Sequence, residues 1–241
     1  LEWQHPVKFN QEQNTTLGAC SYHPPMAHHL DLDAWPRRAS FEFFRGFDKP
    51  YFNVCTRLDV TALVALKPRL AGSLWLAYHH LVLRAANHIE PFRWRLEGGR
   101  VRVLDTVHAS TTVLRDDESI GFAYLDWDPD FARFAAAAAP VAAAVRRGDR
   151  VFDPGLDATA HLHFTTLPWL DFTSFSHARN WGREDSVPKF AFGRLQPEGM
   201  RTTMAFSVEV HHALMDGLHV GRMVQALEAW LQDPAPWLGL A

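Results

Sequence analysis

A strand that leads directly into an amphipathic helix, near the carboxyl end of the chain, most limits the folds open to this sequence. Residues 204–210 alternate in strand fashion, with β-branched and aromatic side chains. Beyond Gly217, apolar residues recur at helical spacing as far as Leu231. The segment between them reads His211-His212-Ala-Leu-Met-Asp216-Gly217. Its histidines therefore stand where a strand ends, on a rigid support from which side chains reach a cleft.

Several chemistries fit these residues. A histidine that is neutral near pH 7 can act as a general base, and the carboxylate four residues later can orient it, pair with an arginine or cap the helix. The plainer alternatives are a polar strand end, a hydrogen-bonded core histidine and an ordinary Asp-Gly turn. A metal site made of His211, His212, Asp216 and His219 is less favoured, because successive strand residues point to opposite faces.

Composition narrows the class of protein. A length of 241 residues with 47% hydrophobic content suits one globular domain, and the net charge of −3 gives no footprint for nucleic acid. No apolar run approaches the ~20 residues of a membrane span, and the first residues lack a signal-peptide pattern. Two cysteines, Cys20 and Cys55, are too few for a disulfide framework. We expect a cytoplasmic protein without membrane or nucleic-acid partners.

The order of periodic segments predicts a single α+β domain with a large mixed β-sheet flanked by helices. Residues 1–30 are expected to form an N-terminal extension, residues 31–232 the catalytic domain and residues 233–241 a tail. The predicted helices cover 33–46, with Asp33 near the cap, 61–70, 73–89, 128–147, with a kink or break at Pro140, and 218–231. The predicted strands cover 51–60, 91–96, 100–104, 110–114, 121–127, 161–167, 170–175, 188–195 and 200–210.

The motif His-His-x-x-x-Asp-Gly in this setting resembles the active-site motif of the chloramphenicol acetyltransferase family. Three further blocks resemble that family in the same order: Trp35-Pro-Arg37-Arg38-x-x-Phe41-Glu, Asp105-Thr-Val107-His108, and Leu167-Pro-Trp169 with Phe172-Thr-Ser174-Phe175. The resemblance spans about residues 30 to 232 and implies the family's two-layer sandwich.

The resemblance also implies roles. His212 would remove the proton from an acceptor hydroxyl, which then attacks the thioester of acetyl-CoA, a co-substrate, without an acyl-enzyme. Ser174 would hydrogen-bond the oxyanion, Asp216 and Arg37 would form a structural ion pair, and Gly217 would permit the turn. The family forms homotrimers with active sites between subunits. There the neighbour would supply much of the acceptor pocket, including the strand beginning at Tyr51 and the N-terminal helix.

Departures from the family pattern bear on the substrate. Phe44 stands where many members have a tyrosine lining the acceptor site, and Ala191 replaces a threonine near the transition state. Leu195 replaces a tyrosine near the coenzyme, while Arg194 keeps the cation that would meet a CoA phosphate. Asp171 brings a carboxylate near Ser174. With Tyr51, the residues Phe44, Asp171 and Ala191 make up the expected acceptor pocket.

We therefore expect an acetyl-CoA-dependent O-acetyltransferase that confers antibiotic resistance by acting on chloramphenicol or a similar small alcohol. Alternatives are an acyltransferase of the same fold with another acceptor, and a ligand-binding relative without turnover. A metal-dependent hydrolase is the weakest alternative, and no metal is expected. The absence of a Gly-x-Ser-x-Gly elbow argues against a serine hydrolase.

Overall fold

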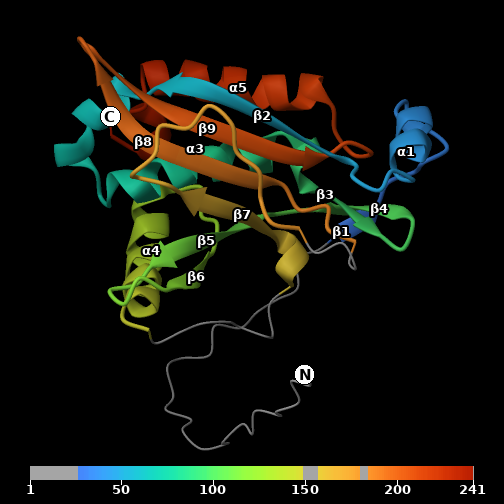
Figure 1. Cartoon of the computed structure of the whole chain (residues 1–241), viewed down its shortest axis with the longest axis horizontal. Helices are drawn as coiled ribbons and strands as arrows, with labels where there is room; N and C mark the ends of the chain where they lie inside the picture. Colours follow the sequence, from blue (N-terminus) through green and yellow to red (C-terminus); the bar gives the residue numbers. More distant parts are fainter. Residues whose placement is uncertain (1–26, 149–156, 180–183, 241) are drawn as a thin grey trace, which may run out of the picture.

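The computed structural model describes residues 27–148, 157–179 and 184–240, so most of the expected N-terminal extension lies outside the described residues. Figure 1 shows strands in front of helices. The strands are β1 (Ala27–His29), β2 (Tyr51–Asp59), β3 (Trp94–Glu97), β4 (Arg100–Leu104), β5 (His108–Leu114), β6 (Ile120–Leu125), β7 (His161–Thr166), β8 (Lys189–Glu198) and β9 (Arg201–His211). The helices are α1 (Arg38–Phe44), α2 (Thr61–Ala65), α3 (Leu74–His88), α4 (Phe131–Arg146) and α5 (Gly217–Gln232), with short 3₁₀ turns η1 (Lys67–Arg69), η2 (Glu90–Arg93), η3 (Ala158–Ala160) and η4 (Pro236–Leu238).

A six-stranded mixed sheet dominates the fold, which confirms the predicted class. Its strand order is β2-β9-β8-β7-β5-β6, and β7 runs parallel to both of its neighbours while the other pairs are antiparallel. A second sheet of three strands, in the order β1-β4-β3, lies beside it. Because β1 pairs with β4, the end of the expected extension already belongs to a sheet. The segment after residue 232 also packs, since Leu238 in η4 is buried.

The two faces of the large sheet differ in chemistry. On β9, Phe206, Val208 and Val210 point into the hydrophobic core that also contains the apolar faces of α3, α4 and α5. The alternate positions of the same strand, Ser207, Glu209 and His211, therefore lie on the opposite face. We call this second side the open face, because irregular chain rather than helices crosses it (Figure 1).

The segment 170–175 is not a strand, contrary to the prediction. The N–H of Leu167 donates to the carbonyl of Phe192, and the N–H of Arg194 donates to the carbonyl of Leu170. These bonds bring the loop over the bulge between Phe192 and Leu195 of β8. Gly193 allows this close approach, since a Cβ there would lie 3.0 Å from the carbonyl oxygen of Leu170. The loop is fixed by contacts distant in sequence and not by a strand ladder.

Three helix predictions also need correction. The first helix begins at Arg38 rather than near Asp33, because the residue before Pro36 is disfavoured in helical conformation. Asp33 instead accepts a hydrogen bond from the side chain of Arg38. The region 61–70 divides into α2 and η1. Of the kink or break expected at Pro140, the break is absent, since α4 is one helix through that residue. Its alanine-rich neighbours have high helix propensity, which offsets the one hydrogen bond that proline removes.

Candidate active site

His212 follows the last residue of β9 and is held on three sides. Its N–H donates to the carbonyl of Pro50 at 2.6 Å. Its ring Nδ1 lies 3.1 Å from the carbonyl oxygen of Met215. A carbonyl only accepts hydrogen bonds, so Nδ1 carries the hydrogen, and in the neutral ring Nε2 keeps its lone pair. This geometry leaves Nε2 as the nitrogen able to accept a proton.

Two aromatic residues fix the plane of the His212 ring. Phe44 of α1 stacks on it with the ring centroids 3.8 Å apart and the planes 11° apart, and Phe52 of β2 lies 4.8 Å away. These contacts place α1 and the start of β2 against the base of their own chain. The expectation that a neighbouring subunit supplies these elements to the acceptor pocket stays a prediction.

Among the described residues, the polar partners of the Asp216 carboxylate are Arg37, the N–H of Leu218 and His219, and not the His212 ring. Its carboxylate pairs with Arg37 at 2.5 Å and accepts the N–H of Leu218 at 3.1 Å, which caps α5. Arg37 also donates to the carbonyl of His212 at 3.4 Å. Burial alone would raise the pKa of Asp216, but the charge of Arg37 holds that pKa below its usual value. The ion pair thus reaches His212 through the backbone, which differs from a serine-protease triad.

His219 completes the turn at the start of α5. Its Nδ1 accepts the N–H of Asp216 at 3.1 Å, the reciprocal bond of a capping box. Burial lowers the pKa of His219, which favours the neutral ring that this bond requires. Gly217 contributes less than expected: it has no positive φ, and a Cβ there would meet nothing within 4 Å. Gly217 permits the turn, as predicted, but neither its φ nor the space around it requires a glycine.

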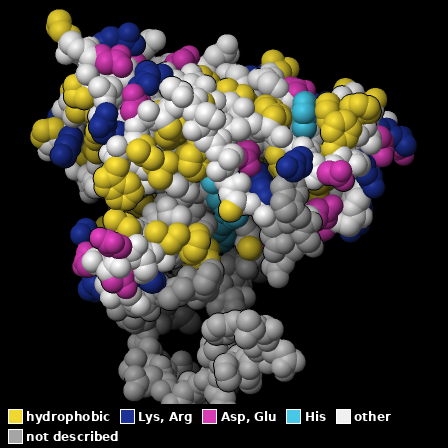
Figure 2. Space-filling model, viewed as in Figure 1, with side chains coloured by type: hydrophobic (Ala, Val, Ile, Leu, Met, Phe, Trp, Pro, Cys, Tyr) yellow, Lys and Arg dark blue, Asp and Glu magenta, His cyan; other side chains and the backbone are white. Residues whose placement is uncertain are grey.

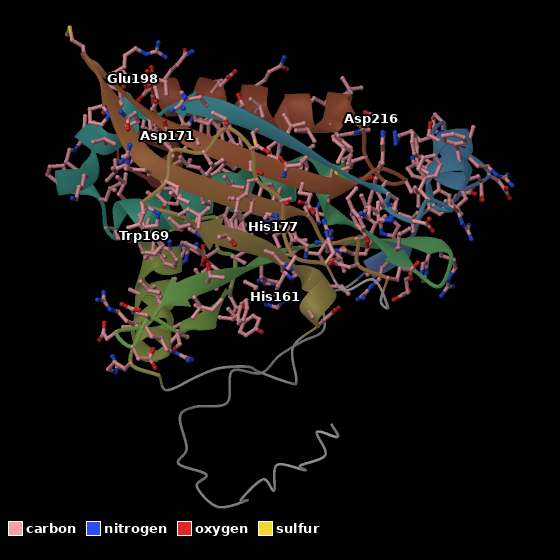
Figure 3. The ribbon with its side chains drawn as sticks, in the orientation of Figure 1. His161, Trp169, Asp171, His177, Glu198 and Asp216 are labelled. Atoms are coloured by element: carbon pink, nitrogen blue, oxygen red, sulfur yellow. The ribbon has the colours of Figure 1, made fainter. Side chains whose placement is uncertain are left out.

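Ser174 is exposed, and its neighbours in the chain contact β9 several residues before His212. Three residues before Ser174, Asp171 pairs with Arg57, which lies opposite Ala205 of β9. Three residues after Ser174, the N–H of His177 donates to Glu209 of β9. Along β9, the place of Ser174 is about five residues before His212, a separation of roughly 17 Å at the usual rise of a strand. In Figure 3 the labelled Asp171 and Asp216 lie toward opposite ends of the large sheet. One chain alone does not bring the predicted base and oxyanion donor together.

The expected acceptor and coenzyme residues are spread across the sheet. Asp171 forms a two-pronged ion pair with Arg57, at 2.8 and 3.0 Å, so its charge is already matched. Ala191 is buried in β8 between Thr165 and Ser207. The Arg179 guanidinium lies 3.9 Å above the ring of Tyr51. Arg194, at the bulge of β8, donates to Gln196 at 2.9 Å and stays exposed.

A buried network of charges on the open face was not predicted. Arg179 pairs with Glu209 at 2.6 Å and with Asp185 at 3.0 Å, and Asp185 pairs with Lys189 at 3.0 Å. Lys189 then donates to Nδ1 of His163 at 2.8 Å. We call these five residues the charge network. It ties the chain on either side of residues 180–183 to β7, β8 and β9.

Desolvation and the charge network set the protonation of its members. Burial would raise the pKa of Glu209, but hydrogen bonds from His177 and the charge of Arg179 lower it to about 2. Burial, followed by the charge of Lys189, lowers the pKa of His163 to about 3, so that ring is neutral. Burial and Arg179 likewise lower the pKa of His211 to about 4. His163 and His211 therefore act as neutral hydrogen-bonding groups near pH 7.

A cavity of about 470 Å³ on the open face was also missed. Figure 2 looks onto this side, where histidine side chains (cyan) show in a hollow among charged and hydrophobic groups. The floor comes from alternate residues of four strands, and the wall from Phe175–Ala178 and Ala158. The floor residues are Ser110, Thr112, Phe122, Tyr124, His161, His163, Thr165 and Lys189. The sequence signal was polar residues at every second position of strands whose other face is apolar.

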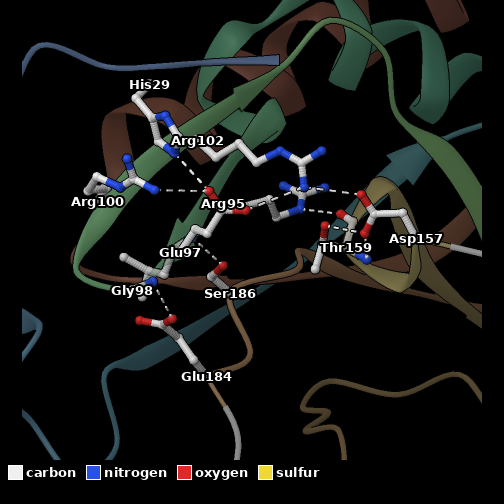
Figure 4. A network of polar contacts seen from close by, with 11 residues as sticks. His29, Arg95, Glu97, Gly98, Arg100, Arg102, Asp157, Thr159, Glu184 and Ser186 are labelled. Atoms are coloured by element: carbon white, nitrogen blue, oxygen red, sulfur yellow. Dashed lines mark hydrogen bonds and ion pairs between the residues drawn. The ribbon is translucent and has the colours of Figure 1, made fainter. Parts of the chain in front are cut away.

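Segments next to the cavity lining are tied to the smaller sheet (Figure 4). Ser186 accepts the N–H of Leu96 at 2.8 Å, and Glu184 accepts the N–H of Gly98 at 3.2 Å. Asp157 pairs with Arg102 at 3.1 Å. Glu184 and Ser186, and Asp157 directly before Ala158 of the cavity wall, are thus positioned by β3, β4 and their turn.

Two further findings concern the described part of the chain. No group of three or more histidine, cysteine, aspartate and glutamate side chains there has an arrangement that would hold a metal ion. None of the helices within residues 27–148, 157–179 and 184–240 is long and apolar enough to cross a membrane.

Comparison with known proteins gives a consistent picture. The model of the family described as chloramphenicol acetyltransferase matches residues 26–228. A chloramphenicol acetyltransferase of Streptomyces acrimycini is 33% identical over 87% of this chain and 96% of its own length. Chloramphenicol acetyltransferase 2 of Escherichia coli is 30% identical over 83% of this chain and 94% of its own length.

Solved structures extend the likeness to the fold. A structure of a chloramphenicol acetyltransferase superposes with a TM-score of 0.77 at 24% identity, covering 86% of this chain and all of that one. The dihydrolipoamide acetyltransferase of Azotobacter vinelandii reaches a TM-score of 0.60 at 17% identity, covering 83% of this chain and 88% of that one. With the family model covering most of its length, this acyltransferase chain belongs to the chloramphenicol acetyltransferase family.

Proposed function

We propose that the protein transfers the acetyl group of acetyl-CoA to a hydroxyl of chloramphenicol or a similar small alcohol. The observation that carries the proposal is the orientation of His212. Its Nδ1 is occupied by the carbonyl of Met215, which leaves Nε2 as the base. Membership of the family supports acyl transfer from a thioester. Within this proposal the protein is a cytoplasmic resistance enzyme.

The proposed reaction needs one base and one oxyanion donor. Nε2 of His212 takes the proton of the acceptor hydroxyl while its oxygen attacks the thioester carbonyl. The Ser174 hydroxyl donates to the oxyanion of the tetrahedral intermediate. That intermediate then expels the thiolate of coenzyme A, which receives the proton from the imidazolium. The ion pair of Arg37 and Asp216 holds the backbone of His212 during the cycle, and Arg194 meets a coenzyme A phosphate.

The proposal places the active site between two chains. Ser174 and His212 of one chain are separated by roughly 17 Å along the sheet, so a neighbour's Ser174 must complete the site. We propose a homotrimer, in which each interface holds one site. The aromatic wall of Phe44 and Phe52 then belongs to the chain that supplies the base.

Purified protein tests the proposed activity directly. The protein is incubated with acetyl-CoA and chloramphenicol, and the release of free thiol is followed. His212→Ala should lower the rate by ~10²–10⁴-fold, the usual contribution of general acid–base catalysis. No thiol release from the native protein, or an undiminished rate in His212→Ala, rejects the proposal.

A mixing experiment tests the shared site. His212→Ala and Ser174→Ala chains are each assayed alone and then after joint refolding. With interfacial sites, mixed trimers contain some interfaces that combine an intact His212 with an intact Ser174, so activity rises above that of either parent. Activity no higher than that of the parents contradicts the interfacial site, while light scattering reports the oligomeric state independently.

An acceptor other than chloramphenicol is the second candidate. Lys189 and the histidines bring polar groups into the lining of the open-face cavity, which is otherwise mostly apolar and includes Phe122 and Phe175. A panel of small alcohols assayed with the same thiol release separates this candidate from the first. A higher kcat/KM for another alcohol than for chloramphenicol favours it.

A further inference from the structure

A second cavity, lined by three tryptophans, lies on the helical side of the large sheet. Its volume is about 370 Å³, within the usual range for sites of small molecules. None of its lining residues also lines the open-face cavity. We call it the tryptophan pocket, and its lining residues are Arg84, Asn87 and His88 at the end of α3, Trp127 after β6, Trp230 of α5 and Trp237 of η4.

The indole rings of this pocket are held in place by the protein itself. Trp230 and Trp237 pack against each other with their ring centroids 4.7 Å apart. Trp127 stacks on the buried ring of His80, with the centroids 4.8 Å apart. Leu238, the residue after Trp237, is buried in the hydrophobic core and fixes the turn η4. The aromatic walls are therefore preformed, and binding a ligand would cost little side-chain ordering.

Arg84 brings a positive charge into this aromatic surface. Its guanidinium carbon lies 5.7 Å from the ring centre of Trp127 and 6.0 Å from that of Trp237, within the range of cation–π contacts. Its Nη2 donates to the carbonyl of Pro129 at the surface. Its Nη1 is neither enclosed nor bonded to a described residue. A guanidinium has five N–H donors, so Arg84 keeps donors that a ligand can reach.

The charge of Arg84 is not balanced by a carboxylate of the described residues. The lining of the pocket contains neither aspartate nor glutamate. The acids of the adjoining segment, Asp128 and Asp130, lie 2.8 and 3.6 Å from the guanidinium of Arg133 and pair with it. Burial lowers the pKa of Arg84, and no neighbouring carboxylate offsets that effect. The carbonyl end of α3 adds roughly half a negative charge, which the full positive charge of Arg84 outweighs.

An aromatic wall and an unbalanced cation together define the ligand. We propose that the tryptophan pocket is a second binding site, which takes a small aromatic carboxylate. The ring of the ligand packs on the indoles, and its carboxylate accepts charge-assisted hydrogen bonds from Arg84. This inference goes beyond the proposed acetyl transfer and does not depend on it, because the pocket contains none of the proposed catalytic groups.

Fluorine NMR of the whole protein, labelled with ring-fluorinated tryptophan, tests the site. Replacing each pocket tryptophan by phenylalanine in turn assigns its resonance. Three probes are titrated: naphthoate, naphthylmethanol, which has the same rings without the charge, and acetate, which has the charge without the rings. We expect naphthoate to shift the resonances of Trp127, Trp230 and Trp237 saturably. Its affinity should exceed that of either other probe by at least ~10-fold, the lower limit for a hydrogen bond to a charged group.

Variants of Arg84 then assign the preference for the anion. Arg84→Met removes the charge but keeps an apolar stem, so the affinity for naphthoate should fall to that for naphthylmethanol. Arg84→Lys keeps the charge and should keep most of the preference. Arg69→Met is the matched control: it removes an exposed arginine of η1 outside the pocket, so the preference should be unchanged. Added salt should weaken the binding of naphthoate and leave that of naphthylmethanol unaltered.

The outcomes decide the inference independently of turnover. Equal affinities for naphthoate and naphthylmethanol in the native protein overturn it, and so do resonances of the three tryptophans that do not move. An unchanged preference in Arg84→Met overturns the role of Arg84. If Arg84→Met does not fold, the comparison of the three probes on the native protein and the salt dependence decide the inference. The thiol-release assay reports separately on acetyl transfer.

Discussion

Substitution of Glu209 by glutamine tests the charge network of the open face. The side chains of Glu209 and Arg179 are each 6% exposed, so water screens their attraction very little. Glutamine keeps the size and one hydrogen-bond acceptor but removes the charge. Because Arg179 keeps Asp185 as a partner, the free energy of unfolding should fall by ~3 kcal/mol, the low end of the range for breaking a buried ion pair. For a chain of this length, that corresponds to a melting temperature lower by roughly 6–12 °C.

Thermal unfolding at fixed protein concentration measures this loss. The sign of the pH dependence follows from the lowered pKa of Glu209. Its contribution is fully present above the ordinary carboxyl pKa of 4.5 and is lost as the pH falls toward about 2. The gap between native protein and Glu209→Gln should therefore be constant from pH 8 to about 5 and shrink only in stronger acid. Equal melting temperatures at pH 7, or a gap that closes on the alkaline side, would refute the reasoning.

Two other substitutions probe the neighbourhood of the site. Asp216→Asn keeps a helix cap but loses the ion pair with Arg37. Because the carboxylate is 39% exposed, the free energy of unfolding should fall by only ~0.5–1 kcal/mol. The kcat should drop ~10–100-fold, because His212 is no longer held in its position. An unaltered kcat in the thiol assay would show that the pair does not position the base. Gly193→Ala places a Cβ 2.9 Å from that of Ala205, so urea unfolding should show a loss of ~1–3 kcal/mol, and a neutral result would mean that the loop moves freely.

Local patterns predicted the elements well where local interactions decide them. The change from strand to helical period after His212 correctly located β9 and α5, and Glu97-Gly98-Gly99 correctly located a hairpin whose glycines have positive φ. The segment 170–175 failed because its backbone bonds go to β8, which the chain reaches about 20 residues later and only by folding back. No local period reports such a partner.

The candidate site divides in the same way. The pair of Arg37 and Asp216 is present as expected, although its partners are 179 residues apart, because the resemblance to a known family carried that information. The distance in space between His212 and Ser174 could not be predicted from the sequence around either residue. Polar residues at every second position, in His161-x-His163 and in Ser207-x-Glu209-x-His211, are the sequence pattern that indicates a polar face of the sheet. Which charges meet across that face depends on strand order, and single-strand patterns do not specify it.

The anchoring of Glu184 and Ser186 to the small sheet has a consequence for evolution. Asp185 lies between these two residues and pairs with Lys189 in the floor of the cavity. A shift of β3 should therefore move Asp185 and, with it, Lys189. Laboratory selection for a new acceptor range should therefore enrich substitutions around Leu96–Gly98, remote from the catalytic histidine. Substitutions in the small sheet would then change the acceptor specificity without changing the groups that react.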